Sequence, residues 1–205
     1  MGYRSRVECR IVGDKEAMLD VIAQMRLTEE KSGLLIRKLN EGQIDAALLT
    51  LPVEDRNLTG SVLFDEPFRL AVPATHRLAT RHEIDIDLLS GERLMLLEEG
   101  HCLRDQALEV CRLSGAREHE SFRGTSLETL RQMVMAGVGM TLLPELACRT
   151  AGAAPAVGGL SILPFPAGRY YRRVGLFWRK TSALSALLEQ TAELIATTVA
   201  PQIAA

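Results

Sequence analysis

The residues best suited to chemistry lie close together in the segment GHCLRDQALEVC, residues 100–111. Cys102 follows a predicted turn and stands at the expected start of a helix, where unpaired backbone N–H groups and the helix dipole favour an anion such as a thiolate. His101 and Arg104 lie beside it in the sequence and could add positive potential. A thiolate attacks a peroxide oxygen and becomes a sulfenic acid, and a second thiol within reach condenses with that acid to a disulfide.

The second thiol of this segment is Cys111, nine residues after Cys102. In one straight helix the two Cα atoms would lie about 13.5 Å apart and on opposite faces. A disulfide requires Cα atoms within about 7 Å of each other. Bond formation would therefore have to melt and rebuild this segment, which is the behaviour of a two-state redox switch.

Two other interpretations of these cysteines stay open at this stage. Free cysteines in α/β domains are most often small, buried apolar residues without any chemistry. A metal site could also be built from His101, Cys102, Cys111 and His119, although C-x8-C is not a usual zinc spacing. The sequence holds no C-x-x-C motif, so zinc-ribbon and thioredoxin-like sites lose their main support.

The composition favours a folded, reduced protein. Apolar residues make up 47% and charged residues 24% of the 205 positions, and the net charge is −2. This balance excludes a disordered chain and argues against nucleic-acid or membrane-surface binding by the whole chain. The four cysteines are too few for a disulfide scaffold, and Cys9 and Cys148 carry no local cue.

Apolar stretches long enough for a membrane helix are absent from the sequence. The longest nearly apolar run covers residues 46–53, whereas a membrane helix needs roughly 18–20 residues. No apolar segment of the kind found in secretion signals follows the first six residues. We therefore expect a cytoplasmic protein without a membrane partner.

Strand-like and helix-like segments alternate along the chain. Short apolar runs bounded by Gly or Pro predict strands, and longer runs with an apolar face predict helices. We expect strands at residues 21–27, 44–51, 62–64, 68–72, 93–97, 140–143, 160–165 and 173–178, and helices at 30–40 and 103–113, after Thr125, and from Ser182 onward. Repeated alternation of this kind predicts an α/β fold with a mostly parallel sheet.

The unit that follows Gly124 carries the clearest local cues. Thr125 at the N-cap and Glu128 three residues later form a predicted capping box. Gly137 is expected to end this helix. Residues 151–159 are rich in Ala, Gly and Pro and are predicted to form a loop.

Three stretches resemble the effector-binding domain of LysR-type transcription regulators, namely LNEGQIDAALL (39–49), DEPFRLAVPATHRLA (65–79) and AGVGMTLLP (136–144). The segment GHCLRDQALEVC and the stretch FRGTSLETLRQMVMAGVGMTLLPELA (122–147) resemble, more specifically, the hydrogen-peroxide-sensing members of that family. The likeness covers roughly residues 22–200. The block GHCLRDQ is the most specific part of it.

The resemblance implies a fold of two α/β lobes, like that of a periplasmic binding protein. The first lobe would combine residues 1–72 with residues 167–205, and the second lobe, residues 73–166, would carry the redox cysteines. The two chain crossovers would lie near Pro73 and near residues 164–166.

The resemblance also implies roles for individual residues. Cys102 would be the peroxide-reactive thiolate and Cys111 the resolving thiol. The other residues implied in the pocket or at the edge of the cleft are His101, Ser32, Asp105, Arg172 (with Arg169 and Arg173 as alternatives) and Ser126. No cofactor and no metal are implied. Without the resemblance, Ser32 and Ser126 would be taken as ordinary helix caps, and Arg172 as a solvated charge at a strand end.

Two departures from the family pattern affect these expectations. Residues 1–20 do not resemble the strand and proline-containing helix with which the family's domain opens, so the first lobe is expected to have an unpaired edge and an incomplete pocket. The family's winged helix-turn-helix is also missing from this sequence, and we find no recognition-helix pattern in it. DNA would be contacted only through a helix-turn-helix outside this sequence.

The function implied is that of a peroxide-sensing regulatory domain rather than an enzyme. Its expected partners are hydrogen peroxide, a second copy of the chain (four copies in the intact regulator) and a thiol reductant such as glutaredoxin. Two alternatives remain: a thiol peroxidase, which would run the same thiolate chemistry repeatedly, and a LysR-type domain that binds a small organic effector and has inert cysteines.

Overall fold

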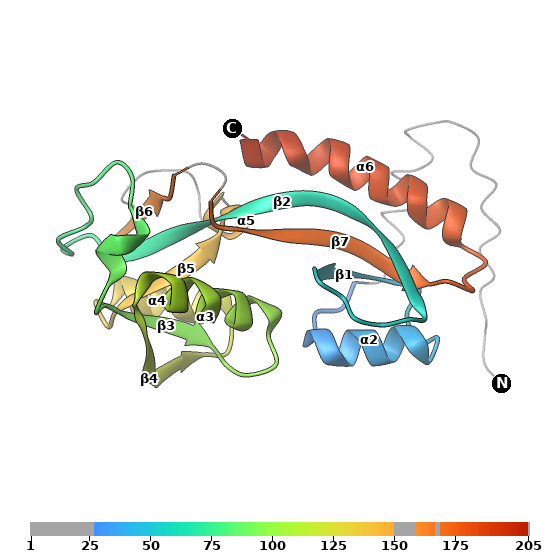
Figure 1. The fold of residues 1–205 in the computed structure, drawn as a ribbon, viewed down its shortest axis with the longest axis horizontal. Helices are drawn as coiled ribbons and strands as arrows, with labels where there is room; N and C mark the ends of the chain where they lie inside the picture. Colours follow the sequence, from blue (N-terminus) through green and yellow to red (C-terminus); the bar gives the residue numbers. More distant parts are fainter. Residues whose placement is uncertain (1–26, 150–158, 167–168, 205) are drawn as a thin grey trace.

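The computed structural model describes residues 27–149, 159–166 and 169–204. Figure 1 shows two long strands running across the molecule and joining two groups of smaller elements. The elements are α2 (Ser32–Asn40), β1 (Ala46–Thr50), β2 (Leu58–Pro73), η1 (Ile86–Leu89), β3 (Arg93–Leu97), α3 (Cys102–Ser114), β4 (Arg117–Gly124), α4 (Leu127–Met135), β5 (Met140–Pro144), α5 (Glu145–Arg149), β6 (Leu160–Pro164), β7 (Tyr171–Arg179) and α6 (Ser185–Ala204).

The long strand β2 connects the two groups. Its first part pairs with β7, from Leu58 opposite Arg179 to Pro67 opposite Tyr171. Its second part pairs with β5 on one side and β6 on the other. The order along the sheet is β1-β7-β2-β5-β3-β4, with β6 beside β2. One strand therefore belongs to both groups of elements.

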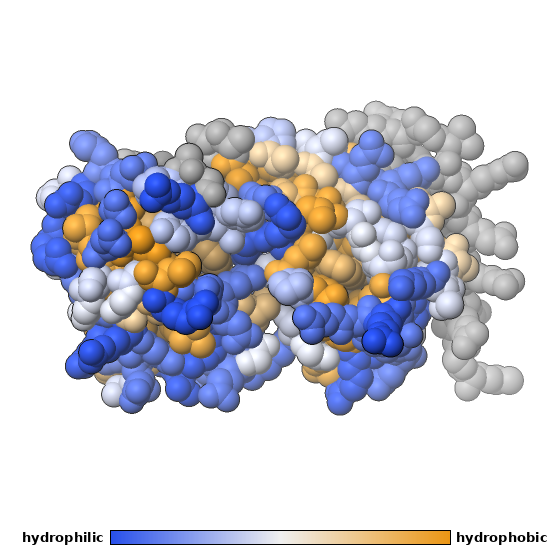
Figure 2. All heavy atoms as spheres, viewed as in Figure 1, coloured by the Kyte–Doolittle hydropathy of each residue, from blue (hydrophilic) through white to orange (hydrophobic). Residues whose placement is uncertain are grey.

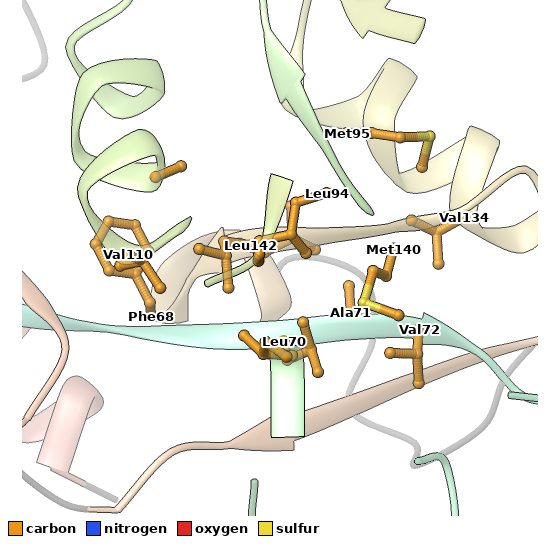
Figure 3. Close-up of a cluster of buried hydrophobic side chains, with 14 of the residues drawn as sticks. Phe68, Leu70, Ala71, Val72, Leu94, Met95, Val110, Val134, Met140 and Leu142 are labelled. Atoms are coloured by element: carbon orange, nitrogen blue, oxygen red, sulfur yellow. The ribbon is translucent and has the colours of Figure 1, made fainter. Parts of the chain in front are cut away.

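The hydrophobic core is divided in the same way. The largest cluster lies among β2, β3, β5, α3 and α4, and Figure 3 shows part of it, including Leu70 of β2, Leu94 of β3 and Leu142 of β5. A second cluster lies under α6 and includes Trp178, which is 2% exposed. A third packs α2 against β1 around Leu39. The α/β fold expected from the sequence is confirmed.

The expectation of a mostly parallel sheet is wrong. Of the strand pairs in the described residues, only β3–β4 and β3–β5 are parallel, whereas β1–β7, β2–β5, β2–β6 and β2–β7 are antiparallel. Parallel strands need a crossover connection, and among the described elements only α3 and α4 supply one. The continuous apolar run of β3 is buried between its two parallel neighbours, as expected for a central parallel strand.

The two short strands expected at 62–64 and 68–72 are one strand of sixteen residues. The residues between the two expected strands are Asp65, Glu66 and Pro67. In the structure Glu66 is fully buried and Asp65 pairs with Arg173, so both carboxylates are accommodated within the ladder.

The prediction of a capping box between Thr125 and Glu128 is wrong. Ser126, not Thr125, caps α4, and its Oγ accepts a hydrogen bond from the backbone N–H of Thr129 at 3.1 Å. Glu128 instead accepts hydrogen bonds from Arg131 on its own helix. The other expected helices and strands lie within a few residues of their observed bounds. Residues 21–26 of the first expected strand and residues 151–158 of the expected loop lie outside the described residues.

No helix in the described ranges is both long and apolar enough to cross a membrane. On the face drawn in Figure 2, hydrophobic side chains reach the surface in several places among charged ones.

Candidate redox site around Cys102

Cys102 is the first residue of α3 and is half-buried. The chain reaches it through Gly100, whose φ of +91° lies in the region that favours glycine, and through His101, which caps the helix in an extended conformation. His101 makes no side-chain capping bond, so the first-turn N–H groups are not covered by its imidazole. The thiol therefore stands at the positive end of the α3 dipole.

Thr50 contacts the Cys102 thiol. Its Oγ1 lies 3.2 Å from the Cys102 Sγ, within hydrogen-bonding distance. Thr50 is the last residue of β1, which packs with α2 in a hydrophobic cluster separate from that of α3. Sequence reasoning missed this residue because 52 positions separate it from Cys102, and the cue available was only a hydroxyl at the end of an apolar strand.

A second contact joins the same two groups of elements. The Lys31 Nζ donates a hydrogen bond to the carbonyl of Glu99 at 2.7 Å, three residues before Cys102. The stem of Lys31 also packs so closely on Gly100 that a Cβ there would lie 2.8 Å from the lysine Cδ. The start of α2 is therefore docked on the loop that leads to Cys102. Ser32, predicted to line the pocket, is the half-buried first residue of α2.

Arg104 does not act on Cys102 as the sequence suggested. Its guanidinium is buried and donates to both carboxylate oxygens of Glu118, at 2.7 and 2.8 Å, and to the Leu97 carbonyl at 3.0 Å. These hydrogen bonds lower the pKa of Glu118 and raise that of Arg104. The arginine charge is thus neutralised by Glu118, and the residue fastens the first turn of α3 to β3 and β4.

Cys111 lies on the buried face of α3 and is 4% exposed. Burial raises the pKa of the Cys111 thiol to about 11, and the negative charge of Glu118 adds to this effect. Cys111 is therefore a neutral thiol near pH 7. Cys102 and Cys111 are both free, and α3 runs without a break from Cys102 to Ser114. The expected helix between the two cysteines is confirmed.

The remaining predicted site residues on α3 and α4 are exposed. Asp105 lies in the first turn of α3, on its solvent side. Ser126 is exposed and makes the helix cap described above.

Arg172 of β7 forms an ion pair with Glu66 of β2. Its Nε donates to the Glu66 carboxylate at 2.7 Å, and Glu66 also accepts from the Leu146 N–H at 2.8 Å. The neighbouring Arg173 is paired with Asp65, and Arg169 is exposed. Among the hydrogen bonds and ion pairs of the described residues, none joins Arg172 to Cys102.

The proposed metal-ligand set is not brought together. Within the described parts of the chain, no three His, Cys, Asp or Glu side chains form a group able to hold a metal ion. His119 instead packs its ring edge-on against Phe122, with 4.9 Å between the ring centroids. Cys148, which carries no local cue in the sequence, is half-buried, and burial raises the pKa of its thiol to about 12. Cys9 lies outside the described residues.

Comparison with known proteins places these features in a family. Residues 23–200 match the LysR substrate binding domain. Over 172 residues the chain is 41% identical to the hydrogen peroxide-inducible genes activator of Dickeya chrysanthemi and 42% identical to the DNA-binding transcriptional dual regulator OxyR of Escherichia coli K12. Each match covers 84% of this chain and 55% of the relative, so the chain spans about half the length of these relatives.

Solved structures give the same result. The crystal structure of the oxidised form of OxyR matches with a TM-score of 0.75 and 41% identity, covering 86% of this chain and 82% of the other. The reduced form of OxyR matches with a TM-score of 0.77 and 37% identity, covering 88% of this chain and 86% of the other. The chain therefore belongs to the family of LysR substrate-binding domains.

Proposed function

We propose that this chain is the hydrogen-peroxide-sensing regulatory domain of a LysR-type transcription regulator, and that it switches by forming a reversible disulfide between Cys102 and Cys111. The observation that carries the proposal is the placement of the two thiols: one half-buried at the start of α3, the other buried nine residues later in the same helix. The similarity of the chain to hydrogen peroxide-inducible genes activators supports hydrogen peroxide as the oxidant.

The first step oxidises Cys102. Its thiolate attacks one oxygen of hydrogen peroxide, the S–O bond forms as the O–O bond breaks, and hydroxide leaves and takes up a proton to become water. The sulfur loses two electrons and the peroxide gains them. The half-buried position of Cys102 leaves room for a small oxidant to reach the sulfur.

The second step condenses the two sulfurs. The Cys111 sulfur attacks the sulfenic sulfur, the S–S bond forms, and the leaving hydroxide combines with the thiol proton as water. The Cα atoms of two residues nine positions apart in a helix lie about 13.5 Å from each other, so α3 must unwind before the bond can form. Unwinding also exposes Cys111 to water, which lets its thiol ionise more readily.

The proposed pocket around Cys102 contains His101, Asp105, Ser32, Arg172 and Ser126. The change in α3 is proposed to alter the surface through which copies of the chain associate as dimers, and as tetramers in the intact regulator. DNA contacts would come from a helix-turn-helix segment of the intact protein, and reduction from a thiol reductant such as glutaredoxin.

The two lobes expected from the sequence are proposed to meet along β2. Residues 1–72 and 167–205 would form the first lobe and residues 73–166 the second. The separation of the core cluster around β3 and α3 from those around α6 and α2 supports this division.

The proposal is tested by peptide mass mapping after an equimolar pulse of hydrogen peroxide, with remaining thiols blocked under native conditions. We expect a cross-linked pair of peptides containing Cys102 and Cys111 within seconds, and its loss on treatment with a dithiol. Two unmodified thiols after the pulse would overturn the proposal. Repeated peroxide consumption with a dithiol reductant would instead identify a thiol peroxidase.

A further inference from the structure

We infer that Thr50 is a positioning residue for the peroxide reaction, whose hydroxyl donates a hydrogen bond to the Cys102 thiolate. The role of Thr50 in peroxide chemistry rests on the proposed function, whereas the contact between Thr50 and Cys102 is present in the structure with both cysteines free. The Thr50 Oγ1 lies 3.2 Å from the Cys102 Sγ.

The backbone of Thr50 is fixed by strand pairing, which allows its hydroxyl to orient the Cys102 sulfur. It ends β1, where it lies opposite Val174 of β7 in an antiparallel pair. The next residue continues the ladder, because the Leu51 N–H donates to the Arg173 carbonyl at 2.9 Å. A β-branched side chain on a strand has restricted χ1 rotation. The hydroxyl is therefore presented from a fixed strand end rather than from a loop.

The position of Cys102 is also fixed by contacts of its neighbours in the chain. Leu103, which follows Cys102, is buried in the largest hydrophobic cluster, and Arg104 binds Glu118, so the first turn of the helix is held in place. The Lys31 bond to the Glu99 carbonyl holds the preceding loop against α2. Because α2 and β1 share one hydrophobic cluster, this second contact keeps Thr50 and Cys102 at a constant separation.

The chemistry of the contact favours the thiolate. A hydrogen bond that is donated to a charged group stabilises the charged form, so the Thr50 hydroxyl favours the ionised sulfur. The donor adds to the effect of the α3 dipole at the same atom. The contact also limits rotation of the Cys102 side chain, which leaves the sulfur in one orientation for attack on the peroxide.

The contact exists only while Cys102 stands at the start of α3. When Cys102 moves to join Cys111, its sulfur leaves Thr50, and one of the contacts between β1 and the α3 region is lost. The Thr50 contact therefore contributes to the stability of the reduced form as well as to the reactivity of Cys102.

The test compares Thr50→Val, which keeps the shape and removes the hydroxyl, with Thr50→Ser, which keeps the hydroxyl. Alkylation of Cys102 by iodoacetamide is followed from pH 5 to 10 by mass spectrometry of its peptide, and the oxidation rate with hydrogen peroxide is measured separately. We expect Thr50→Val to shift the alkylation profile to higher pH by about 0.5–1 unit and to slow oxidation at neutral pH about 3–10-fold. Thr50→Ser should restore both to within about twofold of the parent chain.

Controls separate this role from a general loss of structure. Thr59→Val changes an exposed threonine on β2 and should leave both measurements unchanged. Thr50→Ala is a second hydroxyl-free variant in case valine impairs folding. An unchanged alkylation profile in the folded hydroxyl-free variants would overturn the inference. If the parent chain does not react with peroxide, the proposed function fails, yet the alkylation profile still decides the role of Thr50.

Discussion

The Arg104 guanidinium holds both carboxylate oxygens of Glu118, and the two side chains are only 7% and 15% exposed. Arg104 lies two residues after Cys102, whereas Glu118 lies on β4. The first turn of α3, which carries Cys102, is thus tied to β4, the strand that follows the helix in the chain. The helix that we propose unwinds on oxidation is held at its start by one of the least exposed ion pairs of the described residues.

Glu118→Gln should destabilise the reduced chain by about 2–3 kcal/mol, because it leaves the Arg104 charge poorly compensated in a largely buried position. Urea unfolding of the reduced protein measures this loss. The matched control is Glu109→Gln, which breaks an exposed pair with Arg112 on the same helix and should change stability by no more than about 0.5 kcal/mol. Equal effects of the two substitutions would show that the Arg104 pair contributes no more than a surface pair.

Gly100→Ala should destabilise the chain and loosen the loop before Cys102. The backbone φ of +91° is unfavourable for alanine, and the added Cβ would lie 2.8 Å from the Lys31 Cδ. We expect a loss of about 1–3 kcal/mol and a changed alkylation rate at Cys102. Gly33→Ala is the control: it lies within α2 with no atom within 4 Å of its Cβ position, and it should stabilise the chain by about 0.5–1 kcal/mol. A loss at Gly33 as large as that at Gly100 would contradict this account.

The free energy of unfolding should depend on pH in the alkaline range because of the Cys111 thiol. Burial raises the pKa of its thiol from 9.0 to about 11, so the folded chain favours the neutral form. The stability gained from this preference is fully present below pH 9 and is lost as the pH rises from about 9 to 11. Denaturant unfolding at pH 8, 9, 10 and 11 should show a decline that is shallower in Cys111→Ala. Parallel declines in the two proteins would indicate that Cys111 ionises as it does in the unfolded chain.

Replacing Cys102 by serine and replacing Cys111 by serine should give different products after treatment with peroxide. Cys102→Ser should abolish the peroxide-dependent change, because no other sulfur in the described residues stands at a helix start. Cys111→Ser should leave Cys102 as a sulfenic acid that a dimedone probe captures, because the resolving sulfur is gone. Mass spectrometry of the two variants distinguishes these states. A peroxide-dependent conformational change that persists in Cys102→Ser would exclude this cysteine as the sensor.

Local patterns in the sequence predicted α3 well, because its determinants are local. The turn at Gly100, the apolar face that includes Leu103 and Val110, and Gly115 in a left-handed C-cap all lie within sixteen residues. Periodicity also placed β3 and β5 correctly. It could not give strand direction, because an apolar run is the same in parallel and antiparallel pairs.

The parts that sequence reasoning missed depend on contacts between distant positions. The gap expected between residues 64 and 68 is filled by continuous strand, where Glu66 is paired with Arg172, 106 residues further along the chain. Arg104 suggested a positive charge beside Cys102, and only the fold brings Glu118 close enough to neutralise it. Thr50 lacked any motif that linked it to a thiol 52 residues away.

The shared strand β2 also has a consequence for how the chain is made. Its first part pairs with β7, whose residues are about a hundred positions later in the chain. At roughly 5–20 residues per second, the ribosome delivers that partner about 5–20 s after β2 has been synthesised. Residues of the α3 region can pair locally during this interval, whereas, among the described strands, the first part of β2 and the whole of β1 have β7 as their pairing partner and must wait for it. The contact between Thr50 and Cys102 is therefore among the last to form on a nascent chain. Until β7 has been synthesised, β1 and the first part of β2 are unpaired, and these are the strands that we expect chaperones to bind.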